Sequence, residues 1–152
     1  MNVLTNHADL DGHDQLAALM AANRHPPIGE TEFALVELER GRVVFGGSPP
    51  RKFYNLVGSV HGGYAATLLD SACGCAVHSS LPVGQGYTTL ELKVSYHRAL
   101  SEVSGPVRAK GKIVSLGRHV GFSEARLLDE QGQLCASATS TLLIFPIATS
   151  AG

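Results

Sequence analysis

The feature that most constrains how this chain can fold is a long apolar segment, residues 59–80, which contains a single carboxylate. Its apolar residues keep a 3.6-residue period, and a His-Gly-Gly turn beginning at His61 precedes them. We therefore predict a central helix from about Gly62 to Ser80. Asp70 is its only charged residue apart from histidine, and its helical neighbours are small or apolar. A carboxylate in such surroundings is either a structural group bonded to nearby backbone or a catalytic group.

After this segment the period of the apolar residues falls from 3.6 to 2, which predicts strands. Residues 89–96 alternate strictly, and Leu90, Leu92, Val94 and Tyr96 are expected to share one face. Three more long strands are predicted at residues 107–116, 119–128 and 133–145, joined by turns at Gly117 and at residues 129–132. Small residues at alternate positions of the last two strands favour a sheet that closes around the helix. They are Gly121, Ser123, Ala125, Ala136, Ala138 and Ser140.

The chain before the central helix is expected to contribute a short helix and a β-hairpin. Residues 15–23 contain strong helix formers with apolar residues on one side, and two prolines at positions 26 and 27 end that pattern. Residues 31–39 and 42–45 alternate around a turn at Gly41, which is typical of a hairpin. Turn-forming residues dominate residues 46–55, where we predict an irregular loop.

Length, charge and cysteine usage narrow the classes of partner. A chain of 152 residues fits one domain, and a formal net charge of -1 provides no basic surface for nucleic acid or an anionic membrane. The three cysteines lack metal-ligand spacing, so we expect reduced, packed thiols and no metal site. The polar N-terminus, and the lack of an apolar run of about 20 residues, predict a cytoplasmic protein without a membrane span. The expected partners are small molecules or further copies of this chain.

Three segments stand out in combination: HGGYAATLLDSACG, TTLELKVSYHRAL and GRHVGFSEARLLDEQGQLCASATSTLLIF. Together they resemble the PaaI-type acyl-CoA thioesterases of the hotdog fold. The resemblance implies an α+β fold, in which an antiparallel β-sheet wraps a long central helix. It also implies a homodimer with two active sites at the interface, which commonly pairs into a homotetramer. The implied domains are a leader with a short helix (1–28), a hotdog thioesterase domain (29–146) and a tail (147–152).

The activity implied by the resemblance is hydrolysis of acyl- or aryl-coenzyme A thioesters without a metal or other cofactor. Asp70 would be the acidic catalyst, and the backbone N–H of Gly62 would donate to the thioester carbonyl. A hydroxyl group at the start of the strand after the helix would orient the attacking water. Thr89 matches that position, with Thr88 as the alternative.

The other candidate site residues would support these groups or bind substrate. The resemblance makes Asn55 and His61 polar companions of the catalytic groups, although both residue types also form turns and helix caps. The candidates for substrate binding are Gly63, Tyr64, Leu68, Thr88, Arg118 and His119, the last two for coenzyme A phosphates. Cys73 is expected to be a packing residue because no base is recognisably paired with it. His78 and His97 are expected at surface or edge positions.

The spacing of Gly62 and Asp70 has a consequence for assembly. Eight residues along one helix span about 12 Å, and the two positions differ in direction by about 80°. One chain therefore cannot place both groups on the same carbonyl, so the pair has to come from two subunits. Asp70 would then act as a general base toward water or as a nucleophile, and the sequence leaves both routes open.

Two other functions use the same fold. A hydratase or dehydratase would act on acyl thioesters, but the helix lacks the usual histidine five positions after an aspartate. A non-catalytic acyl-CoA-binding module of a regulator would need a DNA-binding part. The region of about 30 residues before the first strand is too short for a helix-turn-helix unit.

Overall fold

The computed structural model describes residues 7–22 and 33–148. In chain order the elements are α1 (Gly12–Ala21), β1 (Phe33–Glu39), β2 (Arg42–Gly47), the 3₁₀ turn η2 (Arg51–Phe53), α2 (Gly62–His78), β3 (Gln85–Tyr96), the 3₁₀ turn η3 (Glu102–Ser104), β4 (Val107–Leu116), β5 (Val120–Leu128) and β6 (Leu134–Pro146). Among the described residues, no helix combines the length and the apolar character that crossing a membrane requires.

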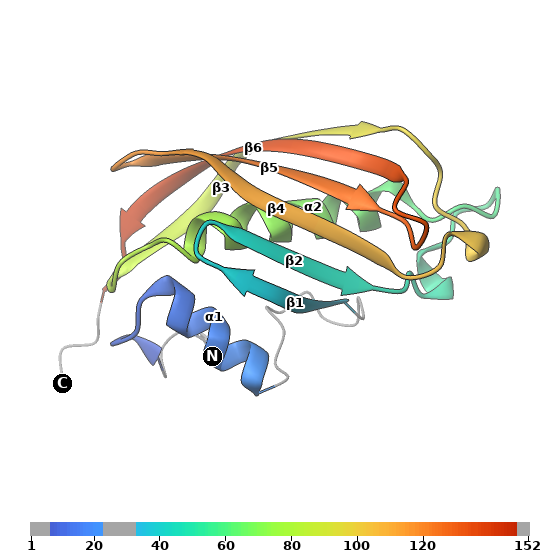
Figure 1. Cartoon of the computed structure of the whole chain (residues 1–152). Helices are drawn as coiled ribbons and strands as arrows, with labels where there is room; N and C mark the ends of the chain where they lie inside the picture. Colours follow the sequence, from blue (N-terminus) through green and yellow to red (C-terminus); the bar gives the residue numbers. More distant parts are fainter. Residues whose placement is uncertain (1–6, 23–32, 149–152) are drawn as a thin grey trace.

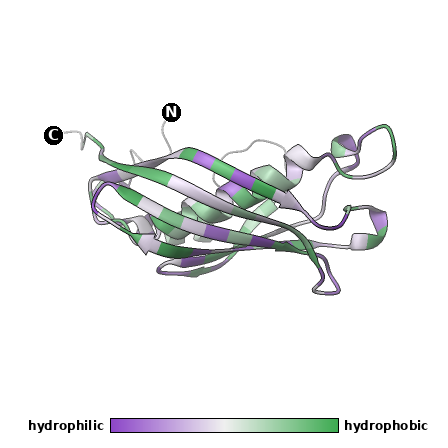
Figure 2. Cartoon of the chain, turned by 90° about the horizontal axis from the view of Figure 1, so that it is seen from above, coloured by the Kyte–Doolittle hydropathy of each residue, from purple (hydrophilic) through white to green (hydrophobic). Residues whose placement is uncertain are grey.

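The six strands form one sheet in the order β1-β2-β4-β5-β6-β3, and all neighbours are antiparallel. The sheet curves around α2, and α1 packs outside it against β1 and the end of α2, as Figure 1 shows. Seen from above, hydrophilic and hydrophobic residues alternate along the strands (Figure 2). The predicted α+β fold, a long central helix wrapped by an antiparallel sheet, is confirmed.

Small residues allow the sheet to approach α2 closely. Leu68 and Ala72 are fully buried, and all six small residues predicted to face the helix are buried as well. A Cβ at Gly111 in β4 would lie 2.2 Å from the Ala72 carbonyl oxygen, so no other residue fits at this position without moving the helix. A Cβ at Gly121 in β5 would lie 3.1 Å from the Val77 side chain. The sheet therefore packs against the backbone of α2 as well as against its side chains.

β3 departs from the predicted alternation at Leu90. Thr89 pairs with Leu142 of β6 and Glu91 with Thr141, so Leu90 is an extra residue in a β-bulge. Its side chain is 59% exposed, whereas Leu92 packs against the core. The prediction that these two leucines share a face is therefore wrong, because the bulge reverses the alternation between them.

Several predicted boundaries shift by a few residues. α2 ends at His78, two residues before the predicted end, and β3 begins at Gln85, four residues before the predicted start. β2 continues to Gly47, and residues 51–53 form η2, so the irregular loop predicted for residues 46–55 is shorter and contains a helical turn. The prolines at 26 and 27 lie outside the described residues.

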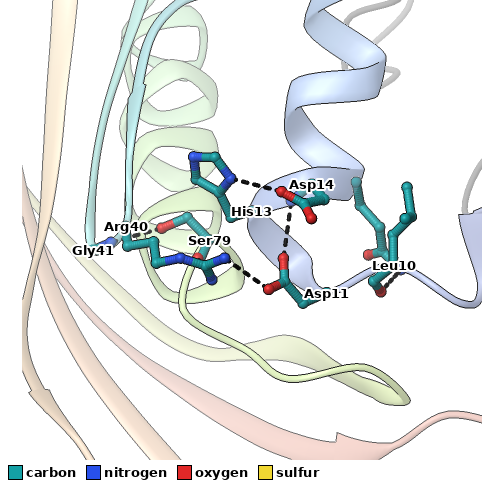
Figure 3. Close-up of polar contacts among 8 residues, drawn as sticks. Leu10, Asp11, His13, Asp14, Arg40, Gly41 and Ser79 are labelled. Atoms are coloured by element: carbon teal, nitrogen blue, oxygen red, sulfur yellow. Dashed lines mark hydrogen bonds and ion pairs between the residues drawn. The ribbon is translucent and has the colours of Figure 1, made fainter.

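α1 is held against the body at its N-terminal end (Figure 3). It begins at Gly12, three residues before the predicted start, because the Asp11 carboxylate caps the backbone N–H of Asp14 at 3.0 Å. The Arg40 guanidinium lies 2.7 Å from the other Asp11 oxygen. The backbone N–H of Gly12 donates to the Leu81 carbonyl oxygen at 2.9 Å. The short helix lies on the body as predicted.

His78 is buried beneath α1, contrary to its predicted surface position, and is 4% exposed. The side-chain N–H groups of Gln15 donate to the carbonyl oxygens of His7 and Leu10. The Gln15 Oε1 atom therefore accepts a hydrogen bond from His78 Nε2, 2.8 Å away. Nδ1 of His78 has no hydrogen-bond partner within the described part of the chain. Burial lowers the pKa of this imidazole, and the Asp11 carboxylate opposes that shift.

Candidate active site

Asp70 and Thr89 form a hydrogen-bonded pair halfway along α2. The Thr89 hydroxyl donates to the Asp70 carboxylate, with 2.9 Å between Oγ1 and Oδ1. Both side chains are half-buried. Thr88, the alternative hydroxyl, is exposed and lies on the opposite face of the strand. Because Thr89 gives its only hydroxyl proton to Asp70, its oxygen lone pairs remain available as acceptors.

The first turn of α2 presents an open backbone donor at Gly62. His61 is the N-cap residue: its Nδ1 accepts the N–H of Gly63 at 2.9 Å, and its carbonyl oxygen accepts the N–H of Tyr64 at 3.0 Å. Across residues 7–22 and 33–148, no acceptor bonds to the N–H of Gly62. This N–H lies at the positive end of the helix dipole. The interpretation of His61 as a helix cap is confirmed.

A cleft of about 280 Å³ opens at Gly62, between the start of α2, the end of β3 and the start of β6. Tyr96 closes one side of it, and its hydroxyl donates to the Gly62 carbonyl oxygen at 2.7 Å. A Cβ at Gly62 would lie 3.0 Å from the Tyr96 hydroxyl oxygen, so glycine gives room to the tyrosine ring. Sequence reasoning gave Tyr96 no role in the site, although its place at the end of an alternating strand was a usable signal.

Within one chain the Gly62 donor and the Asp70 carboxylate are separate. Their eight-residue spacing on a regular helix corresponds to about 12 Å. The cleft at Gly62 is lined by the end of β3 and does not include Asp70 or Thr89. The Gly62 donor and the Asp70 carboxylate therefore lie at separate places on one chain, one at the start of α2 and one at its middle.

The Asn55 carboxamide is engaged within its own loop. Oδ1 accepts the backbone N–H groups of Val57 at 3.0 Å and Ser59 at 3.1 Å, and Nδ2 lies 2.8 Å from the Ser59 hydroxyl. These bonds confirm that Asn55 forms a turn. The carboxamide does not line the cleft at Gly62.

The predicted substrate-binding residues lie in three places. Gly63 is exposed beside the cleft. Tyr64 and Leu68 are 2% and 0% exposed, so they are core residues on the sheet-facing side of α2 and not the lining of an open pocket. Arg118 and His119 are exposed in the turn between β4 and β5, and neither lines the cleft at Gly62.

A model of the thioesterase superfamily matches residues 57–136, which is more than half of the chain. The chain belongs to this superfamily. The matched segment contains the start of α2, Asp70, Thr89 and Tyr96.

Known relatives place this thioesterase among the PaaI-type hotdog proteins. It is 28% identical to the proofreading thioesterase EntH of Klebsiella pneumoniae over 122 residues, which cover 80% of this chain and 88% of EntH. A Halobacterium salinarum protein that is named as an esterase is 45% identical, but the match spans only 44% of each chain.

Solved structures of similar proteins share the fold of this chain. The phenylacetic acid degradation protein PaaI of Thermus thermophilus superposes with a TM-score of 0.68 and 26% identity, over 74% of this chain and 92% of PaaI. The protein smu.793 of Streptococcus mutans, solved with acetyl CoA, superposes with a TM-score of 0.73 and 25% identity, over 81% and 96% of the two chains.

The buried thiols of this thioesterase are unsuited to nucleophilic attack. Burial raises the pKa of Cys73 to about 11. Burial also raises the pKa of Cys75 to about 12. A thiol with so high a pKa is almost entirely protonated at neutral pH, and the thiolate is the reactive form. The prediction that Cys73 is a packing residue agrees with this environment.

Proposed function

We propose that this protein hydrolyses acyl- or aryl-coenzyme A thioesters to the free acid and coenzyme A. The observation that carries the proposal is the hydrogen bond from Thr89 to Asp70. It holds a half-buried carboxylate in one orientation and leaves the threonine oxygen free to accept a hydrogen bond from water. A thioesterase needs a positioned base of this kind.

The proposed reaction uses Asp70 as a general base. A water molecule donates one O–H to the free Asp70 oxygen and the other to the Thr89 oxygen, and its own oxygen attacks the thioester carbonyl carbon. The Gly62 N–H of the partner chain stabilises the negative charge that develops on the carbonyl oxygen. The C–S bond then breaks, coenzyme A leaves as a thiolate and a proton returns to its sulfur. The products are one carboxylic acid and one thiol.

The proposal requires a homodimer, because Gly62 and Asp70 of one chain cannot reach the same carbonyl group. A two-fold axis would create two equivalent sites, and pairing of dimers into a tetramer would leave the chemistry unchanged. We further propose that the protein is cytoplasmic and uses no cofactor, since each step is assigned to a group of the chain itself. Acetyl CoA bound to the similar protein of Streptococcus mutans supports a coenzyme A thioester as the substrate.

The test is a panel of aliphatic and aromatic coenzyme A thioesters, with thiol release followed by a thiol reagent. We expect release from at least one group of thioesters. Hydration of an enoyl-coenzyme A without thiol release would instead identify a hydratase. Tight binding without release across the panel would identify a non-catalytic module. Single-turnover hydrolysis in ¹⁸O-labelled water separates the two roles of Asp70, because label in the Asp70 carboxylate indicates direct attack and would contradict the general-base route.

A further inference from the structure

A second hollow, the outer groove, crosses β3, β6 and β5 on the sheet face that points away from α2. It has a volume of about 410 Å³. Its lining combines small or apolar residues with polar and charged ones, among them Lys93, His97, Glu124, Arg126 and Ser137. We infer that the outer groove binds the phosphate groups of the coenzyme A moiety, an inference that rests on the proposed function.

The charges of the outer groove favour an anion. Arg126 of β5 lies directly opposite Lys110 of β4, and like charges at paired positions repel each other. Glu124 is the one acidic residue lining the outer groove, and it is already paired with Lys112 at 3.1 Å. In the described part of the chain, Lys93, Lys110 and Arg126 have no ion-pair partner. The repulsion between Arg126 and Lys110 lowers stability when no anion is present, and a bound phosphate would reduce it.

Hydrogen-bond donors lie beside these cations. The hydroxyl groups of Ser95, Ser137 and Thr139 line the outer groove. Ser137 pairs with Arg126 across one strand boundary and with Ser95 across the other. The Ser137 hydroxyl oxygen also lies 2.8 Å from Nε2 of His97, which orients that ring. Guanidinium, ammonium and hydroxyl groups together suit the several acceptor oxygens of a phosphate or diphosphate.

The outer groove adjoins the cleft at Gly62 through one shared residue. His97 lines both, and Arg98 lines the cleft next to it. Lys93 lies four residues before His97, about 13 Å along an extended strand. This span is comparable with an extended pantetheine arm. A thioester carbonyl at the Gly62 N–H would therefore allow the nucleotide end to reach the outer groove.

The test measures binding of free coenzyme A to the full-length protein by calorimetry, which does not depend on catalysis. The exposed double substitution Lys93→Gln with Arg126→Gln is expected to weaken binding about tenfold, through loss of two charge-assisted contacts. Pantetheine, which lacks the nucleotide, should bind both proteins equally. Binding of 3′-dephospho-coenzyme A shows which phosphate group the outer groove holds. If it holds the diphosphate, the double variant binds this ligand as weakly, relative to wild type, as it binds coenzyme A. If it holds the 3′-phosphate, the difference between the two proteins becomes smaller. Thermal unfolding verifies that the variant is folded.

Arg42→Gln is the matched control, because Arg42 is an exposed arginine of β2 that pairs with Glu39 and lines neither the cleft nor the outer groove. It should leave coenzyme A binding unchanged. Unaltered binding in the double variant, an equal loss in Arg42→Gln, or no binding of coenzyme A to the wild-type protein would each overturn the inference. In kinetics, the double variant should raise KM for coenzyme A thioesters at unchanged kcat and leave N-acetylcysteamine thioesters unaffected. If no thiol is released but coenzyme A binding still depends on Lys93 and Arg126, the proposed function is rejected. The outer groove would then still be a binding site for coenzyme A phosphates.

Discussion

The chemistry at Asp70 can be separated from its packing by exchanging one carboxylate oxygen for an amide nitrogen. In Asp70→Asn the amide oxygen can still accept the Thr89 hydroxyl, so the melting temperature should change by only a few degrees. Thiol release should fall by about 10²- to 10⁴-fold, the usual contribution of a general base. Steady-state assays with a thiol reagent, beside thermal unfolding, measure the two effects. Wild-type turnover in this variant would eliminate Asp70 as the catalyst.

Thr89 and Thr88 offer a matched pair on adjacent positions of β3. Thr89→Val removes the hydroxyl that donates to Asp70 and keeps the branched shape. Thiol release should fall about tenfold or more, since a hydrogen bond to a charged group contributes about 1.5–3 kcal/mol. Thr88→Val is the control, because that side chain is exposed on the other face. Equal effects of the two substitutions on kcat would show that Thr89 has no special part in the reaction.

Gly111 is the residue whose substitution should damage the fold most directly. An added Cβ would lie 2.2 Å from the backbone oxygen of Ala72, and backbone cannot rotate away as a side-chain end can. Gly111→Ala should lower the free energy of unfolding by about 3 kcal/mol or more, the upper range for overpacked sites. Gly46→Ala is the comparison, because its Cβ would meet the Val36 side chain at an ordinary 3.4 Å. Denaturant unfolding of both variants checks the difference, and similar losses would show that α2 shifts freely.

At the scale of elements, the junction of α1 with α2 should be sensitive to pH. Burial lowers the pKa of His78 below the ordinary value of about 6.5, so around and below pH 6.5 the unfolded chain binds more protons than the folded one. Stability therefore rises with pH through this window and falls as the pH decreases from about 7.5 to 5.5. Denaturant unfolding at the two pH values measures the loss.

The contribution of His78 to this loss is isolated by His78→Gln, which has no ring to protonate. Its stability should differ less between the two pH values than that of the wild-type protein. His119→Gln, at an exposed turn, should keep the full wild-type difference. If His78→Gln loses as much stability on acidification as wild type does, the buried imidazole is not the source.

The elements differ in how far the sequence predicts them. α2 and the strands after it were predictable because periodicity reports which side of an element is buried. The bulge at Leu90 was not, because one extra residue leaves the alternation of residue types unchanged and only strand pairing reveals it. The burial of His78 depends on α1, whose docking involves residues far apart in sequence. Asp70 stood out as a lone carboxylate among apolar residues, and the family pattern gave its expected role and those of Gly62 and Thr89. The hydrogen bond from Tyr96 to Gly62 became visible only in the structure.

At the scale of the whole molecule, the proposed sharing of active sites between subunits predicts complementation between two inactive variants. Asp70→Asn removes the proposed base, and Gly62→Pro removes the proposed oxyanion donor by deleting the backbone N–H. Proline suits the first position of a helix, and the His61 ψ of 133° fits a residue before proline. Random mixing by co-expression should restore about a quarter of wild-type thiol release. About half of the dimers then contain one chain of each variant, and each of these mixed dimers keeps one intact site of two. No recovery beyond the parent variants would place both groups in the same subunit's site.

Gly62→Ala is the control for crowding in that experiment. It keeps the N–H but adds a Cβ against the Tyr96 hydroxyl, 3.0 Å away. Gly62→Ala should therefore retain more thiol release than Gly62→Pro, and the difference between the two reports the backbone donor.

The two edges of the sheet both carry a β-bulge, in β1 between Leu35 and Glu37 and in β3 between Thr89 and Glu91. A regular, flat edge is a template on which further chains can add strands without limit, and this is a common origin of fibrous aggregates. An interrupted edge offers only short regular runs, which in β3 extend from Gln85 to Thr89 and from Glu91 to Tyr96. The irregularity that directs a hydroxyl group toward the Asp70 carboxylate therefore also disfavours polymerisation through this edge.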